Sequence, residues 1–255
     1  MATSSLAKVL KALFLSMGIF MVATLIYFIS TDGSPFRKNL LTPWMVALLI
    51  DFYIHVAILG MWLAYKESNI VSGVSWIVIY ACLGSAATCA YIFIQLMKLS
   101  PEESSRDPIY HVILRRKDSK RQPKKALTPA ITKIFFVSLG LLMVGTLVYT
   151  IILDGLPFRK EVLTPWMIAT LIDFYINVVA ISVWIAYKEE RVYIGAIWII
   201  LIISLGSVAT CAYIVGELMR LSPQDSVSLI LFKRARANRQ EHYSACENSE
   251  ENLPF

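Results

Sequence analysis

Two aspartates, Asp51 and Asp173, lie inside long apolar segments of this 255-residue chain. An aspartate near the centre of a membrane helix costs about 2.5 to 3.5 kcal/mol on insertion, which neighbouring apolar residues can offset. Such a carboxylate is a functional candidate by default and is expected to face the protein interior. It could bind a solute or ion, relay a proton, or only tie helices together by hydrogen bonds, and these interpretations stay open.

Helical spacing places each aspartate on a stripe of polar and aromatic residues. The first stripe comprises Trp44, Asp51, His55, Trp62 and Tyr65, and the second comprises Trp166, Asp173, Asn177, Trp184 and Tyr187. A histidine one turn from a carboxylate can have its protonation tuned by that carboxylate. We therefore predict that Asp51, Asp173, His55 and Asn177 form a binding or ion-relay site. If the two helices face each other in opposite directions, Asp173 pairs with His55 and Asp51 with Asn177.

These segments belong to a unit that is written twice, at an offset of about 122 residues. The string DGSPFRK at residues 32–38 returns as DGLPFRK at 154–160, LTPWM at 41–45 returns at 163–167, and DFYI at 51–54 returns at 173–176. Each unit holds three apolar stretches long enough to cross about 30 Å of hydrocarbon. They cover residues 9–30, 43–65 and 70–97, then 131–153, 165–187 and 192–219.

The fold class predicted from this pattern is an all-α integral membrane protein with six transmembrane helices in two three-helix repeats. The repeats cover residues 1–101 and 130–223, with a basic soluble linker at 102–129 and a polar, disordered tail at 224–255. Three crossings per unit put the second unit into the membrane from the opposite side, so we expect inverted repeats. One feature opposes inversion, because similar basic segments at 112–116 and 229–234 would then lie on opposite sides.

The loop before the second helix of each unit carries further candidates. Thr-Pro-Trp at residues 42–44 and 164–166 is typical of a helix start, with a threonine cap and a proline in the first turn. Trp44 and Trp166 are then either interface anchors or the lining of a vestibule. Basic residues in the same loops either hold lipid headgroups or shape the entrances; they are Arg37, Lys38, Arg159 and Lys160.

Composition excludes several classes. A hydrophobic fraction of 57% with 16% charged residues does not suit an ordinary soluble protein, for which about 25% is charged. The net charge of +6 comes from clusters typical of membrane flanks, so no nucleic-acid partner is expected. There is no metal-ligand spacing, phosphate loop, dinucleotide fingerprint or nucleophile elbow, so we predict no metal, no cofactor and no soluble-type catalysis. Gly84 and Thr88, with Gly206 and Thr210, are expected to let helices pack closely.

The repeated DGxPFRK, LTPWM and DFYI strings resemble a plant family of multi-pass membrane proteins, domain of unknown function 1475, over residues 16–223. The resemblance implies a plant integral membrane protein and no particular activity. Our leading hypothesis is a carrier or channel for a small solute or ion, in contact with the lipid bilayer. A membrane-embedded lipid or isoprenoid enzyme with a buried aspartate as general acid is a second hypothesis. A non-enzymatic scaffold or lipid-interacting protein is a third.

Overall fold

The computed structural model describes residues 2–35, 37, 40–67, 69–113, 128–157, 159–222 and 227–231, and every regular element in them is a helix. The first half contains α1 (Ala2–Asp32), α2 (Pro43–Lys66), α3 (Ile70–Leu83), α4 (Ser85–Met97), α5 (Pro101–Arg106) and α6 (Pro108–Ile113). The second half contains α7 (Pro129–Asp154), η2 (Lys160–Val162), α8 (Pro165–Lys188), α9 (Val192–Leu205), α10 (Ser207–Leu218) and η3 (Val227–Leu231).

Four helices, α1, α2, α7 and α8, are long and apolar enough to cross a membrane. The helices α2 and α8 begin as the sequence predicts. The Thr42 hydroxyl accepts a hydrogen bond from the Met45 amide at 3.2 Å, the Thr164 hydroxyl accepts one from the Met167 amide at 3.3 Å, and a proline follows each threonine. These caps satisfy amide groups that the first helical turn leaves without partners.

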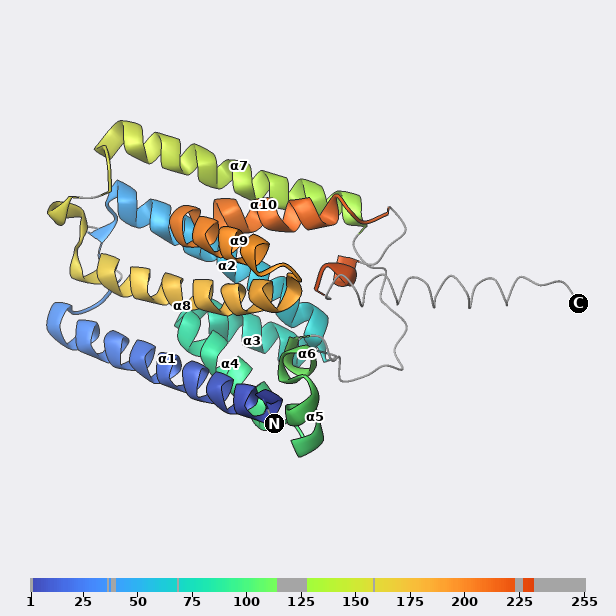
Figure 1. Ribbon diagram of the computed structural model, residues 1–255. Helices are drawn as coiled ribbons and strands as arrows, with labels where there is room; N and C mark the ends of the chain where they lie inside the picture. The colour runs from blue at the N-terminus through green and yellow to red at the C-terminus, as the bar shows by residue number, and fades with distance from the viewer. Residues whose placement is uncertain are drawn as a thin grey trace, which may run out of the picture.

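The third apolar stretch of each half is not one helix. Gly84, at φ +58°, separates the 14 residues of α3 from the 13 of α4, and Gly206, at φ +57°, separates the 14 of α9 from the 12 of α10. The Trp76 and Tyr91 rings, each about two turns from Gly84, lie 5.0 Å apart, so the chain turns back on itself. Figure 1 shows the same return between α9 and α10.

We call α3–α4 the first hairpin and α9–α10 the second hairpin, with Gly84 and Gly206 at their tips. The predicted six spans are therefore not confirmed: four helices have the length to span, and each third stretch forms a hairpin that enters and leaves at one end. A continuous helix over both halves of the stretch would be about 40 Å long, which exceeds the hydrocarbon thickness of about 30 Å.

Inversion of the repeats was also a wrong prediction. At the start of α2, the indole N–H of Trp44 donates to the Gly155 carbonyl at the end of α7, at 3.2 Å. At the start of α8, the Trp166 ring lies 6.3 Å from the ring of Phe28 near the end of α1. Both connections between long helices thus lie at one end of the bundle, which we call the loop end. Helices α7 and α8 of the second half therefore run in the same directions as α1 and α2 of the first half.

The opposite end, which we call the linker end, holds the start of α1 and α7 and the bases of both hairpins (Figure 1). Each hairpin packs against the outer helix of its own half, α4 on α1 and α10 on α7. Glycines allow this approach, because Gly18 faces Cys89 and Gly140 faces Cys211. The first part of the predicted linker forms α5 and α6, which pack on α1 and α4. The rest of that linker, at 114–127, and the tail from 232 lie outside the described residues.

Candidate functional site at the hairpin tips

Each intramembrane aspartate contacts the hairpin tip of the other half. Asp51 on α2 accepts a hydrogen bond from the backbone N–H of Ser207 at 2.7 Å, just after the Gly206 tip. Asp51 lies about 12 Å along α2 from its first residue, so this contact is deep in the bundle. The side chain of Asp51 is buried, as expected for a carboxylate in a membrane helix.

Asp173 on α8 makes the equivalent contact with the first hairpin. It accepts a hydrogen bond from the Ser85 backbone N–H at 2.6 Å and another from the Ser85 hydroxyl at 2.5 Å. The two halves thus exchange contacts: the hairpin of each half ends on the aspartate of the other half. The aspartates thus connect the two halves at the hairpin tips. The spacing of residues within either half did not reveal this connection.

Only glycine fits at the tips. Both tip residues have positive φ, which residues with a Cβ rarely adopt. A Cβ added to Gly84 would overlap the carboxylate of Asp173, and one added to Gly206 would overlap that of Asp51. The glycines therefore do more than the close helix packing that we predicted, since they turn the chain and bring a backbone amide to the carboxylate.

At each tip, the positive end of a helix dipole lies next to a negatively charged carboxylate. The hairpin chain restarts as a helix directly after each glycine, so the positive end of the α4 dipole faces Asp173 and that of α10 faces Asp51. A carboxylate is stabilised at such a terminus by both the dipole and the free amides. Among the described residues, no group of three or more His, Cys, Asp or Glu side chains has the arrangement of a metal site.

His55 is fully buried beside the second tip. Its Nδ1 lies 3.0 Å from the Asp51 carbonyl, and its Nε2 lies 3.2 Å from the Thr210 hydroxyl on α10. The Thr210 hydroxyl can also donate to the Gly206 carbonyl at 3.1 Å. Neutral His55 would accept from Thr210, whereas protonated His55 would donate to it while Thr210 donates to Gly206, so the contacts suit both protonation states.

Asn177 occupies the position of His55 beside the first tip. Its amide nitrogen donates to the Asp173 carbonyl at 3.3 Å, while its Oδ1 is buried without a hydrogen-bond partner among the described residues. The predicted pairs, Asp173 with His55 and Asp51 with Asn177, are wrong. Since α2 and α8 run in the same direction and a hairpin tip contacts each aspartate, all four residues belong to two similar sites and not to two crossed pairs.

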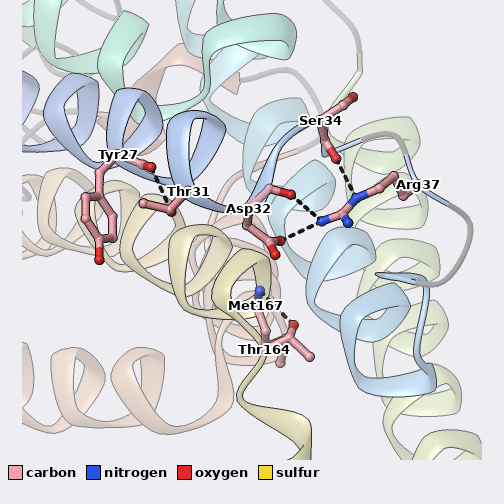
Figure 2. Close-up of polar contacts among 7 residues, drawn as sticks. All are labelled: Tyr27, Thr31, Asp32, Ser34, Arg37, Thr164 and Met167. Carbon is pink, nitrogen blue, oxygen red and sulfur yellow. Dashed lines mark hydrogen bonds and ion pairs between the residues drawn. The ribbon is translucent and has the colours of Figure 1, made fainter.

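The predicted entrance residues lie at the loop end, well away from the tips. Arg37 forms an ion pair with Asp32 at 2.7 Å, and Arg159 forms one with Asp154 at 2.6 Å (Figure 2 shows the first). Both arginines therefore close their own loops. Trp44 and Trp166 are buried in the apolar core. Lys160 is exposed, and Lys38 lies outside the described residues.

The sequence analysis missed the polar groups at the bases of the hairpins. Lys66 donates to the carbonyls of His111 and Val112 at the end of α6, and Lys188 forms an ion pair with Glu217 at 2.6 Å. Both lysines are at least 95% buried. Their repetition at the end of two apolar helices was the available signal.

Comparisons with known proteins give one relationship. No curated protein and no solved structure matches the chain. A family model described as "Protein of unknown function (DUF1475)" matches residues 1–238, a range that includes both hairpins and both aspartates. The chain therefore belongs to the DUF1475 family of proteins of unknown function.

Proposed function

We propose that this protein is a membrane carrier or channel for a small polar solute or ion, in which the two hairpin tips form the gate. The observation that carries the proposal is the reciprocal contact of Asp51 with Ser207 and of Asp173 with Ser85. Half-helices whose amino termini meet polar groups deep in a bundle are a feature of transporter binding sites. The structure then corresponds to a closed state, because each tip is occupied by a carboxylate of the protein itself.

Gating would consist of a tip leaving its aspartate. The bond from Ser207 to Asp51 joins α10 to α2, so breaking it frees an amide terminus and a carboxylate at the same point. Either group can then hold a polar solute that crosses the bundle. A membrane enzyme with one dominant acidic residue does not need this second, equivalent carboxylate, so the duplication favours transport.

His55 offers a route to proton coupling. Its imidazole lies 3.9 Å from the Asp51 carboxylate, and its contact with Thr210 suits both protonation states. Protonation of His55 would turn the Thr210 hydroxyl toward the Gly206 carbonyl at the tip. A proton taken up at His55 would thereby change the hydrogen bonds of the second tip alone.

The distribution of basic residues favours one orientation of the helix bundle in the membrane. Of the twelve lysines and arginines in the described residues, Arg37, Arg159 and Lys160 lie at the loop end, and the other nine lie toward the linker end. Since positive charge favours the cytoplasmic side, the linker end is cytoplasmic in this proposal. The similar basic segments after each unit then lie on one side, which removes the conflict that inversion created.

The test is flux into proteoliposomes containing the purified protein, followed by light scattering with a panel of glycerol, urea, amino acids and monovalent salts. Asp51→Asn and Asp173→Asn each keep an oxygen that can accept from the tip amide, so the fold should persist. We expect either variant to reduce the flux of the permeant solute at least tenfold, because the charge that holds and releases the tip is lost.

Asp32→Asn and Asp154→Asn are matched controls, since they remove a carboxylate only from an exposed loop. They should transport as the wild type does. Equal flux in the Asp51 and Asp173 variants would contradict the proposal, and so would a panel in which no solute crosses faster than through empty liposomes. A loss of thermal stability without any flux to lose would favour the scaffold hypothesis instead.

A further inference from the structure

The two tips are built on one plan but differ in which polar groups are satisfied. At the second tip, His55 contacts Thr210, and the residue one helical turn before Gly206 is the apolar Ile202. At the first tip, the matching positions hold Asn177, Thr88 and Tyr80. A phenol thus replaces an apolar sec-butyl side chain, and an amide replaces an imidazole, so the first tip has more oxygen atoms than the second.

Three of these oxygen atoms are buried without hydrogen-bond partners among the described residues. They are Tyr80 Oη, Thr88 Oγ1 and Asn177 Oδ1, in residues that are 1%, 6% and 0% exposed. Leaving a buried polar group unsatisfied costs about 1 to 3 kcal/mol each, so three together need an explanation. At the second tip, the matching set leaves only the Ser207 hydroxyl without a partner.

The residues that carry these three oxygens flank the tip that is held by the Asp173 carboxylate. Tyr80 lies one turn before Gly84 on α3 and Thr88 lies one turn after it on α4, so both flank the tip that contacts Asp173. Asn177 is one turn along α8 from Asp173 and donates to its carbonyl. One helix, α8, and the two arms of the first hairpin therefore bring these oxygen-bearing side chains to the first tip.

We propose that Tyr80, Thr88, Asp173 and Asn177 form a binding site for a small monovalent cation of the Na⁺ type. Hard cations take hydroxyl, amide and carboxylate oxygens as ligands, and the site offers all three. The negative end of the α3 dipole lies at the same tip as the positive end of the α4 dipole and opposes it, so the charge of the carboxylate supplies the attraction for the cation. One carboxylate balances one positive charge, which favours a monovalent over a divalent ion in this buried setting.

Binding of the cation does not depend on transport. Its role as the ion that couples transport does rest on the proposed carrier function, and there the difference between the tips separates two tasks. The first tip holds the cation, whereas the second tip, with His55 and the apolar Ile202, does not. Binding is therefore measured at equilibrium, in the whole protein, without any flux.

The experiment follows thermal unfolding of the purified protein in nanodiscs at constant ionic strength, with NaCl replaced stepwise by N-methyl-D-glucamine chloride. A ligand that binds only the folded state raises the Tm as its concentration increases. We expect the wild-type Tm to rise with each tenfold increase in Na⁺, and ²²Na⁺ to bind with a stoichiometry of about one per chain.

Tyr80→Phe and Thr88→Val should weaken Na⁺ binding at least tenfold and flatten the Tm response. Without Na⁺, Tyr80→Phe should be about as stable as the wild type, because the Tyr80 hydroxyl forms no hydrogen bond that would be lost among the described residues. The matched control is Thr210→Val, which alters the second tip and should keep the full response to Na⁺. Tyr80→Phe serves as the decisive variant if Thr88→Val does not fold.

A Tm that is the same in Na⁺ and in N-methyl-D-glucamine would overturn the cation site and leave a buried water as the occupant. The site would equally be rejected if Tyr80→Phe and Thr88→Val responded as the wild type does. Failure of the carrier proposal looks different, since Na⁺ would still raise the Tm while no solute crossed. Conversely, flux that depends on Asp51 without any response to Na⁺ would reject the cation site alone.

Discussion

The bases of the two hairpins are attached by different chemistry. The first hairpin is held through α6: Lys66 donates to the carbonyls of His111 and Val112, and the Trp62 indole donates to that of Ile113 at 3.0 Å. At the second base, Lys188 pairs with Glu217, and the Trp184 indole N–H is buried without a hydrogen-bond partner among the described residues. The base of the first hairpin is thus attached through backbone oxygens of α6, whereas the base of the second is attached through the carboxylate of Glu217.

Other contacts are the same at both bases, so the bases differ mainly in the partners of Lys66 and Lys188. Tyr91 donates to Glu67 and Tyr213 donates to Glu189, both at 2.7 Å, and each tyrosine packs against two tryptophans. The segment that anchors the first hairpin also reaches the other half, because Tyr187 donates to Asp107 at 2.8 Å. The additional contacts of α6 predict that the first hairpin is held more firmly than the second.

The largest loss of stability is expected from substitutions at the tip glycines, which the two hairpins have in common. Gly84→Ala and Gly206→Ala each force an alanine into positive φ and overlap an aspartate, and together these terms cost about 3 to 6 kcal/mol. Thermal or denaturant unfolding in nanodiscs measures this loss. Gly216→Ala is the control: it lies inside α10 with open space around its Cβ, so it should gain about 0.5 to 1 kcal/mol. Similar results for Gly84 and Gly216 would mean that the tip does not need its turn.

The attachment of the bases predicts unequal losses. Lys188→Met removes the buried partner of Glu217 and should cost about 3 kcal/mol, the lower range for a broken buried ion pair, because the ion pair of Glu217 with Arg220 involves an exposed arginine. Lys66→Met removes hydrogen bonds to two neutral carbonyls, and the loss of these bonds should cost about 1 to 2 kcal/mol. Unfolding in the same nanodiscs compares the two variants. Lys188→Met combined with Glu217→Gln should recover most of the loss, because glutamine is the residue at the matching position of the first base, Gln95. Equal costs for the two lysines would remove the distinction between the bases.

Cross-linking tests which hairpin moves. A Cβ on Gly140 would lie 3.4 Å from that of Cys211, so oxidised Gly140→Cys can bond to Cys211 and fix α10 to α7. Gly18→Cys can fix α4 to α1 through Cys89 in the same way, with a Cβ distance of 3.2 Å. If the second hairpin is the moving part of the gate, oxidation of Gly140→Cys should reduce flux about tenfold and reductant should restore it.

The Gly18→Cys variant is the matched comparison, because it locks a hairpin that α6 already holds. Its oxidation should change flux less than twofold. A stronger block by Gly18→Cys than by Gly140→Cys would reverse the assignment of fixed and moving hairpins, and no block by either would show that the tips stay in place during transport.

The sequence predicted the long helices and their polar stripe well. The second helix was expected at residues 43–65 and extends over Pro43–Lys66, since its threonine cap, proline and apolar run are all local signals. Asp51 and His55 were expected to face the protein, and both are buried. Local spacing specifies which face of a helix is polar, and here it also placed Asp173 and Asn177 on the corresponding face of α8.

The hairpins were not predicted, because their turn depends on a partner. An apolar stretch with one glycine reads as a continuous helix, and only the carboxylate of the other half makes the positive φ of Gly84 and Gly206 favourable. The excessive length of the stretch was the one local signal. The wrong number of crossings then inverted the second half and paired the wrong residues, so a single missed turn accounts for the errors in topology and in the site.

The smallest loss of stability is expected from substitutions at the loop end, where the two halves form equivalent ion pairs. The pairs Arg37–Asp32 and Arg159–Asp154 have exposed arginines, at 41% and 46%, and bury no charge. Asp32→Asn or Asp154→Asn should therefore lower stability by less than about 0.5 kcal/mol, and added salt should reduce the loss further because it screens exposed pairs. Unfolding at low and high NaCl measures both. A loss comparable to that of Lys188→Met would show that the loops hold the bundle together, and the contrast between the hairpin bases would then no longer identify the moving element.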